Sequence, residues 1–281
     1  MIVASTTIHS KKALFPLRKE GIKVLQITDL HLLSDPRRPL LGLNTDKTFL
    51  DVIESAKSND WPPDYILLSG DLAQEPVVET YLRLRRHLER LQIPCLCLPG
   101  NHDDADVMGD VLQGTEIHFM ERLATRQWQI IPLNSQIPGE EGGHICSDEI
   151  AKLRRCLEEY PDKNALIAMH HHPIPCQSEW MDTMVINNGN RLFAVLDEYK
   201  QAKTLICGHI HQEMDNRHAR YRILGSPSTC FQFKANSKKF KIDLKAPGYR
   251  WLVLFSDGTI RTGVQRLPGI PPRIDLAASK Y

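Results

Sequence analysis

Carboxylate, amide and imidazole side chains recur along the chain in short motifs built around glycine or a single spacer residue. Two divalent cations about 3.5–4 Å apart can clamp a phosphoryl group and produce a nucleophile from water at neutral pH, and holding them takes about this many ligands. Imidazole and carboxylate together suit Fe, Mn, Zn or Co better than Mg or Ca. The set therefore predicts a two-metal site for phosphoester hydrolysis. Its members are Asp29, His31, Asp71, Asn101, His170, His209 and His211, with His102 in addition.

Each motif follows a stretch with the pattern of a β-strand. The strands are predicted over residues 22–28, 65–69, 95–98, 165–169 and 204–207. Apolar residues at helical spacing separate them, within residues 49–56, 81–91, 150–157 and 192–199. Strands that alternate with helices predict an α/β layered domain, whose ligands lie in the loops beyond the carboxyl ends of the strands.

The rest of the chain gives weaker signals. Asn44 and Ser147 are predicted helix caps, and further strands are expected over residues 128–133, 221–224, 251–255 and 259–264. The polar stretch 216–245 is predicted to be a long excursion near the site. No internal repeat or linker stands out, so we expect a single domain over residues 1–281, with a core at about 22–264 and an irregular tail over 265–281.

Composition excludes several classes of protein. The formal net charge is +1, so no whole-protein field favours nucleic acid or membrane. No run approaches the roughly 18 apolar residues of a membrane span, and residues 1–20 lack an apolar core. The seven cysteines show no C-x-x-C spacing, which predicts reduced, buried thiols in a cytoplasmic protein, with Cys95 and Cys97 packed in the core.

The order of the motifs carries a resemblance. Asp-x-His, Gly-Asp, Gly-Asn-His-Asp, a lone His and Gly-His-x-His, in that order, resemble the calcineurin-like metallophosphoesterase superfamily. The flanking words Gly-Asp-Leu-Ala-Gln at 70–74, His-His-His-Pro at 170–173 and Pro-Ser-Thr-Cys at 227–230 resemble its class III cyclic-nucleotide phosphodiesterases. The resemblance covers about residues 22–262 and implies two packed mixed β-sheets flanked by helices.

The resemblance also implies roles for individual residues. Asp29, His31, Asp71 and His211 would hold one ion, and Asp71, Asn101, His170 and His209 the other. Fe²⁺ or Mn²⁺ are the expected metals, with Zn²⁺ or Co²⁺ as alternatives. His102 would protonate the leaving alkoxide, and Asp103 would orient its imidazole. Substrate contacts are expected from the following residues: His31, Asp71, Asn101, His102 and His211, and more weakly His171, Asn188 and Thr229.

The function implied is hydrolysis of 3′,5′-cyclic AMP to 5′-AMP by attack of a metal-bound hydroxide. A phosphodiesterase for another small diester, such as a 2′,3′-cyclic nucleotide or a glycerophosphodiester, is the main alternative. A non-catalytic scaffold of the same fold is disfavoured, because decay of the site should have removed some of the ligands. The expected partner is a small-molecule cyclic nucleotide, without nucleic acid or membrane, bound by a monomer or a homodimer.

Overall fold

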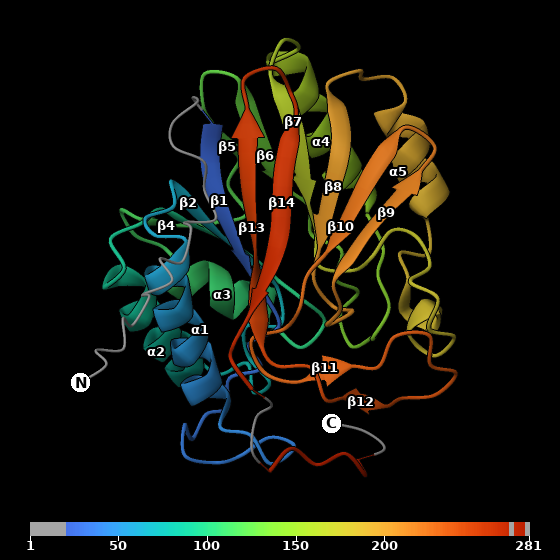
Figure 1. The fold of residues 1–281 in the computed structure, drawn as a ribbon. Helices are drawn as coiled ribbons and strands as arrows, with labels where there is room; N and C mark the ends of the chain where they lie inside the picture. Colours follow the sequence, from blue (N-terminus) through green and yellow to red (C-terminus); the bar gives the residue numbers. More distant parts are fainter. Residues whose placement is uncertain (1–20, 270–272, 279–281) are drawn as a thin grey trace, which may run out of the picture.

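Two six-stranded sheets form the centre of the molecule, and helices cover their outer faces (Figure 1). The computed structural model describes residues 21–269 and 273–278. The first sheet has the order β14-β13-β1-β2-β3-β4, in which β1 to β4 run parallel and β13 and β14 are antiparallel additions. Its strands are β1 (Gly21–Ile27), β2 (Tyr65–Ser69), β3 (Cys95–Leu98), β4 (Ile117–Phe119), β13 (Gly248–Phe255) and β14 (Ile260–Arg266).

The second sheet has the order β5-β6-β7-β8-β10-β9. Strands β6, β7, β8 and β10 run parallel, while β5 and β9 close the two edges in antiparallel fashion. Its strands are β5 (Leu123–Ala124), β6 (Trp128–Pro132), β7 (Asn164–Ala168), β8 (Ala202–Cys207), β9 (Met214–His218) and β10 (Tyr221–Gly225). A separate two-stranded ribbon pairs β11 (Gln232–Phe233) with β12 (Ile242–Asp243).

The helices fall into two groups, one for each sheet. Figure 1 shows α1 to α3 beside the first sheet and α4 and α5 beside the second. Asn44 caps the first helix as predicted, because its side chain accepts a hydrogen bond from the Lys47 amide. The helices are α1 (Thr45–Asn59), α2 (Val78–Glu89), α3 (Ala105–Val111), α4 (Ser147–Glu159), α5 (Gly189–Leu196) and the 3-10 helix η1 (Met181–Met184).

Three apolar layers hold the sheets and helices together. Strand β2 illustrates the arrangement: Ile66 and Leu68 pack under α1 to α3, whereas Leu67 points into the layer between the sheets. Leu166 and Ile206 meet that middle layer from the second sheet, and α4 and α5 cover the far side. Because successive side chains of a strand point to opposite faces, strands buried on both faces read as continuous apolar runs. The prediction of two packed mixed sheets flanked by helices is confirmed.

Several local predictions are wrong. Ser147 is the first residue of α4, and Cys146 occupies the cap position without a side-chain hydrogen bond. The predicted excursion over residues 216–245 is shorter, because β9, which was not predicted, joins the second sheet beside β10, which lies at the predicted strand 221–224. Strand β14 extends to Arg266, so it takes in the start of the predicted tail 265–281. Residues 1–20, 270–272 and 279–281, on which parts of these predictions fall, lie outside the described residues.

Two predictions about composition can be compared with the structure. Cys95 and Cys97 are buried in the first sheet as expected, but Cys146 is exposed and Cys156 is half-buried. Burial of the thiols therefore holds for the other five cysteines only. Within the described ranges, none of the helices combines the length and the apolar composition needed to cross a bilayer.

Candidate metal centre

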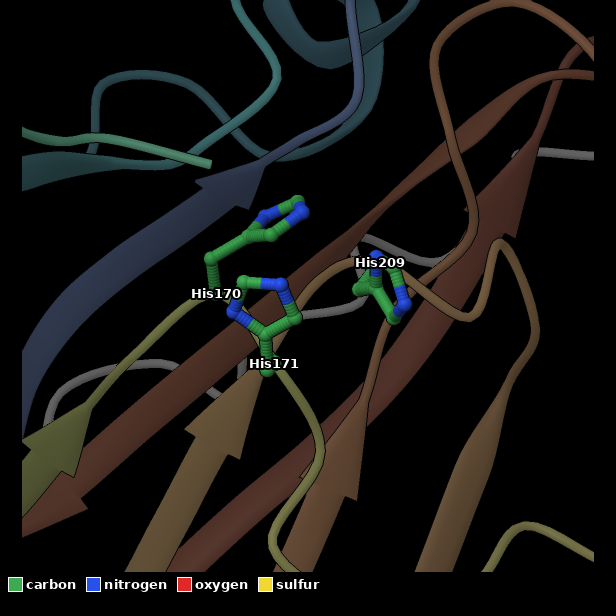
Figure 2. A group of neighbouring side chains, drawn as sticks. All are labelled: His170, His171 and His209. Carbon is green, nitrogen blue, oxygen red and sulfur yellow. The ribbon is translucent and has the colours of Figure 1, made fainter. Parts of the chain in front are cut away.

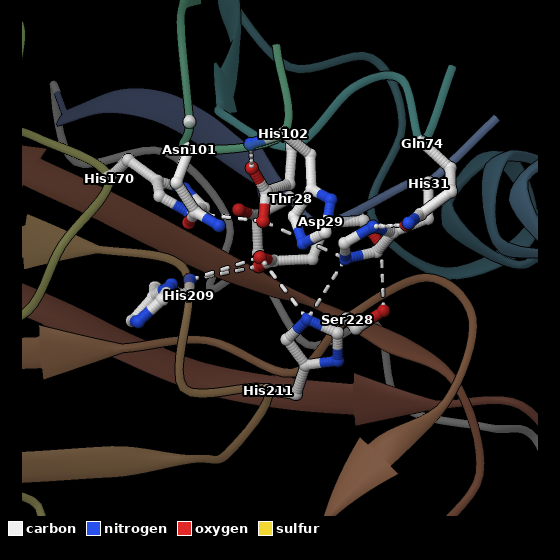
Figure 3. A network of polar contacts seen from close by, with 12 residues as sticks. Thr28, Asp29, His31, Gln74, Asn101, His102, His170, His209, His211 and Ser228 are labelled. Atoms are coloured by element: carbon white, nitrogen blue, oxygen red, sulfur yellow. Dashed lines mark hydrogen bonds and ion pairs between the residues drawn. The ribbon is translucent and has the colours of Figure 1, made fainter. Parts of the chain in front are cut away.

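The predicted ligands meet at the shared end of the two sheets, as Figure 3 shows. Asp29 lies two residues beyond β1, and Asp71 two residues beyond β2. His170 and His209 lie two residues beyond β7 and β8 of the other sheet. The carboxyl ends of parallel strands meet at one edge of a sheet, so packing two such sheets brings both sets of loops together. Asp29, His31, Asp71, His170 and His211 are fully buried, and Asn101 is partly exposed.

The backbone at these positions is unusual. The residues with a left-handed backbone include Asp29, His31, Asp71, His209 and His211, with φ between 48° and 65°. Such angles cost about 1–3 kcal/mol at a non-glycine residue and persist only where the surroundings enforce them. Hydrogen bonds from the Asp29 amide to the Gly70 carbonyl (3.0 Å) and from the His31 amide to the Asp71 carbonyl (2.9 Å) enforce them here. The loops are therefore held in a shape that points their side chains inward.

Two glycines of the motifs allow the loops to approach each other closely. A Cβ atom at Gly100 would collide with the Asp71 carboxylate, and one at Gly208 would collide with the Thr28 hydroxyl. Glycine is the only residue that fits where the backbone of one loop passes directly over a polar side chain of another. This contact explains why the motifs place glycine directly before Asn101 and His209.

The first half of the site is built from Asp29, His31 and His211. The Nδ1 atom of His31 donates to the Gln74 Oε1 atom (2.8 Å), and the Nδ1 atom of His211 donates to the Phe231 carbonyl oxygen (2.8 Å). Their Nε2 atoms then carry lone pairs, and these two atoms lie 3.2 Å apart. The His211 Nε2 atom also lies 3.3 Å from Asp29 Oδ1. Lone pairs that converge in this way fit a bound cation and would otherwise repel.

Asp71 stands between the two halves. Its Oδ2 atom lies 3.2 Å from the His170 Nε2 atom and 3.8 Å from the His31 Nε2 atom. This oxygen is buried, and no hydrogen-bond donor among the described residues reaches it. Its Oδ1 atom accepts a hydrogen bond from the His102 amide (2.9 Å). A buried carboxylate oxygen without a donor, between imidazoles of both halves, fits a ligand that bridges two ions.

The second half contains Asn101, His170 and His209, and Figure 2 shows the two imidazoles together with His171. The Nδ1 atom of His170 donates to the Ser69 carbonyl oxygen (2.8 Å), so its Nε2 atom faces Asn101 Oδ1 at 3.2 Å. The His209 amide donates to both oxygens of Asp29 (3.0 and 3.2 Å). Neither ring nitrogen of His209 has a hydrogen-bond partner in the described part of the chain. Buried nitrogens of this kind fit metal coordination.

Electrostatics of the site differ from one imidazole to the next. Burial lowers the pKa of His31 to about 3, and burial together with His171 and His170 lowers the pKa of His209 well below its usual value. Burial also acts to lower the pKa of His170, but the negative charge of the nearby Asp71 outweighs it and raises the pKa to about 9. Metal ligands must be deprotonated, so a cation that binds here displaces any proton on His170.

Asp103 joins two loops of the site. Its carboxylate accepts hydrogen bonds from the amides of Leu72, Ala73 and Gly100 and from the Tyr81 hydroxyl, at 2.9–3.1 Å. These bonds tie the loop after β2 to the loop after β3. The structure thus gives Asp103 a scaffold role, and its role of orienting the His102 imidazole stays a prediction.

His102 lies at the partly exposed side of the centre. Its ring meets the His31 ring edge-on, with 5.0 Å between the ring centres. One nitrogen of the His102 ring and one possible metal-ligand atom each from His31 and Asp71 all lie within 4.8 Å of one another. This position faces the site from solvent, where a substrate would approach.

The three residues with weaker predictions lie in different surroundings. The His171 ring is buried between the Ser135 hydroxyl (2.8 Å) and the Glu141 carbonyl oxygen (3.2 Å), against His209. Asn188 bonds to the backbone of Ile145 through both ends of its amide. Thr229 is fully buried. The structure therefore brings His171 next to the ligands, while the amide of Asn188 holds a loop.

Two contacts of the centre were not predicted. Gln74 and the Phe231 carbonyl group fix the ring orientations of His31 and His211. Gln74 belongs to the motif Gly-Asp-Leu-Ala-Gln, so its role could have been predicted from the sequence. A backbone carbonyl group leaves no such signal.

Comparison with known proteins agrees with this geometry. The sequence profile of the calcineurin-like phosphoesterases matches residues 22–213. The chain belongs to the calcineurin-like phosphoesterase family. It is 37% identical over 268 residues to the 3′,5′-cyclic adenosine monophosphate phosphodiesterase CpdA of Escherichia coli, covering 95% of this chain and 98% of that protein. It is also 37% identical over 250 residues to a 3′,5′-cyclic-nucleotide phosphodiesterase of Nostoc, covering 89% and 94%.

Solved structures of two phosphatases share the fold. A dimetal phosphatase from Danio rerio has a TM-score of 0.55 at 12% identity, over 86% of this chain and 98% of that one. A purple acid phosphatase from yellow lupin has a TM-score of 0.62 at 11% identity, over 90% and 53%. Identities this low show the fold alone. The buried groups of histidine and aspartate described above are those of a dimetal centre in this family.

Proposed function

We propose that this calcineurin-like phosphoesterase is a dinuclear-metal phosphodiesterase that hydrolyses 3′,5′-cyclic AMP to 5′-AMP. The observation that carries the proposal is the convergence on Asp71 Oδ2 of imidazoles from both sheets, with His31 and His211 Nε2 atoms 3.2 Å apart. The relatives named as cyclic-nucleotide phosphodiesterases match almost their full length, which supports the choice of substrate.

In this proposal the donors divide into two overlapping sets. Fe²⁺ or Mn²⁺ suits the mixture of imidazole, amide and carboxylate groups, and Zn²⁺ or Co²⁺ are alternatives. When bound, the two ions supply charge neutralisation for the phosphoryl oxygens and a nucleophile from water at neutral pH. Asp71 belongs to both sets. Asp29, His31 and His211 complete the first, and Asn101, His170 and His209 complete the second.

The residues of the chain position the substrate and the proton. His102 lies beside His31 at the partly exposed side, and its backbone amide is tied to Asp71. From there its imidazole places a proton on the leaving 3′ oxygen of the ribose, which is a poor leaving group without one. His31, Asp71, Asn101, His102 and His211 would surround the phosphate group.

The setting of this activity is also a proposal. We place the protein in the cytoplasm as a single domain that binds a small-molecule nucleotide as a monomer or a homodimer, without nucleic acid or membrane. The free thiols of the cysteines support this setting. The apolar layer shared by the two sheets supports the single domain.

A hydrolysis panel tests the proposal. Purified protein supplied with Mn²⁺ is offered 3′,5′-cyclic AMP, 3′,5′-cyclic GMP, 2′,3′-cyclic AMP and glycerophosphocholine. We expect 3′,5′-cyclic AMP to be the best substrate, 5′-AMP to be the product, and a chelator to remove the activity. Preference for 2′,3′-cyclic AMP or glycerophosphocholine, or 3′-AMP as the main product, would contradict it.

A further inference from the structure

A second group of metal-binding side chains lies beside the centre and shares none of its proposed ligands. It consists of His172, Cys176 and Asp182, each with a donor atom within 4.8 Å of the others. His172 lies in the loop beyond β7, and Asp182 lies in η1. Cys176 is the only cysteine in any such group among the described residues. A sulfur ligand sets this group apart from the oxygen and nitrogen donors around Asp71.

In this loop the polar side-chain atoms of His172 and Ser178 are buried and unsatisfied, as is the Nε1 atom of Trp180. His172 is fully buried, and neither of its ring nitrogens has a hydrogen-bond partner in residues 21–269 or 273–278. The nearest acidic atom to its Nε2 atom is Asp182 Oδ1 at 3.6 Å, which is too far for a hydrogen bond. The Ser178 hydroxyl is likewise buried without a hydrogen-bond partner in the described residues. Most buried polar atoms in proteins have a hydrogen-bond partner, so the unsatisfied atoms of His172 and Ser178 indicate that a bound ion or molecule occupies this position.

The loop backbone already holds the donors in place. The Cys176 amide donates to Asp182 Oδ1 (2.7 Å), and the Asp182 amide donates to the Ser178 carbonyl oxygen (2.8 Å). The Ile186 amide donates to the His172 carbonyl oxygen (3.1 Å), which fastens the start of the loop to the residues after η1. The side chain of Asp182 is 22% exposed, which leaves a route from solvent.

We propose that His172, Cys176 and Asp182 bind a third divalent ion of the zinc type, with solvent in the fourth position. Thiolate, imidazole and carboxylate form a donor set typical of Zn²⁺, whereas Mg²⁺ and Ca²⁺ require oxygen ligands. Binding replaces the thiol proton of Cys176 by the metal and releases that proton to water.

An ion at this position would stiffen the support of the dinuclear centre. The His172 ring stacks on the His209 ring, with 5.6 Å between ring centres and 24° between planes. His209 has no hydrogen bond to its ring nitrogens from the described residues, so packing by its neighbours sets its orientation. The third ion would therefore fix the ring against which His209 rests, and its role is structural. The inference is independent of the substrate proposed above.

Cobalt titration of the full-length protein tests this site, because only a sulfur ligand gives the near-ultraviolet charge-transfer band of a cobalt thiolate. We expect wild-type protein to develop this band with Co²⁺ and to lose it when Zn²⁺ is added. Cys176→Ser should abolish the band, while Cys146→Ser, which removes an exposed thiol, should leave it unchanged. No band at saturating Co²⁺ would overturn the proposal, as would a band that survives in Cys176→Ser.

A second variant guards against misfolding of the first. Asp182→Asn keeps the size of the side chain and an oxygen for the Cys176 amide. Loss of a direct ligand should cost at least the roughly 10–100-fold in affinity that is typical for loss of an outer hydrogen-bond partner. We therefore expect the cobalt midpoint of Asp182→Asn to rise by at least that factor. An unchanged midpoint would contradict the proposed site.

Discussion

His209 and His211 come from the same motif, share a left-handed backbone and are both buried, yet they are held in different ways. The Nδ1 atom of His211 donates to the Phe231 carbonyl oxygen, and its ring stacks on Phe233 with 4.2 Å between centres. The ring nitrogens of His209 have no hydrogen-bond partner in the described residues, and its ring leans on His170, His171 and His172.

The difference indicates that the two halves of the centre are organised by different forces. A hydrogen bond to the far nitrogen fixes both the tautomer and the direction of a metal-binding imidazole. Packing fixes the plane of a ring but leaves the tautomer open. We therefore expect the ion on the His211 side to bind more tightly than the ion on the His209 side.

Replacement of Asp71, the ligand shared by both ions, should reduce metal binding and hydrolysis the most, because it weakens both halves of the centre at once. Asp71→Asn keeps the shape of the side chain but loses the charge that both ions would share. We expect both ions to be bound poorly and hydrolysis to fall by more than the about 10²–10⁴-fold typical of losing a general acid. Metal analysis and turnover of cyclic AMP measure the two effects. Full activity of Asp71→Asn at low metal would refute the bridging role.

Replacement of His102 should slow hydrolysis but change the binding of either metal ion very little. A ribose alkoxide needs a proton to leave, whereas a nitrophenolate is stable without one. His102→Ala should therefore lose about 10²–10⁴-fold on cyclic AMP and far less on bis(p-nitrophenyl) phosphate, with metal content nearly unchanged. Asn101→Ala is the matched control, and it should slow both substrates and weaken metal binding. Equal slowing of both substrates by His102→Ala at full metal content would show that it is not the acid.

Replacement of Gln74 should have a smaller effect on metal binding, and it tests the half of the centre that contains His31 and His211. The Gln74 Oε1 atom accepts the hydrogen bond that sets the His31 ring. Gln74→Ala should weaken metal binding on this side by about 10–100-fold, as is typical for loss of such a partner. A chelator titration followed by metal analysis measures it. An unchanged metal affinity would show that the loop backbone alone orients His31.

Ser135 should give the smallest effect. Its hydroxyl bonds to His171, which is not among the proposed ligands and only supports His209 by packing. Ser135→Ala should therefore change metal affinity less than Gln74→Ala does. A larger loss in Ser135→Ala, in the same chelator titration, would mean that hydrogen bonds order the second half too.

Much of this centre could be predicted from the sequence, because strand patterns and ligand motifs are local features. The strands before Asp29, Asp71, His170 and His209 all occur close to where they were predicted. Short elements escaped prediction. Strand β5 has two residues and α3 has seven, with Gly109 in its interior, so neither shows a full period of apolar spacing.

The contacts that orient the ligands depend on tertiary structure and could not be predicted. Asp103 stands next to His102 in the sequence, which favoured a catalytic role, and no local pattern predicts that folding also brings Tyr81 and the amides of the preceding loop to its carboxylate. The left-handed backbone of Asp29 and His31 likewise could not be predicted, because aspartate and histidine adopt it more often than most residues but still in a small minority of cases. The unequal support of His209 and His211 appears only once the two sheets are packed together.

The most direct test of the dinuclear centre counts Mn²⁺ ions per chain by equilibrium dialysis, since Mn²⁺ disfavours the thiolate of Cys176. We predict two Mn²⁺ ions in the wild-type protein, with the weaker one missing in His209→Ala and the tighter one missing in His211→Ala. Each variant should retain one ion. A single ion in the wild-type protein, or two ions of unchanged affinity in both variants, would contradict a dinuclear centre divided between these two histidines.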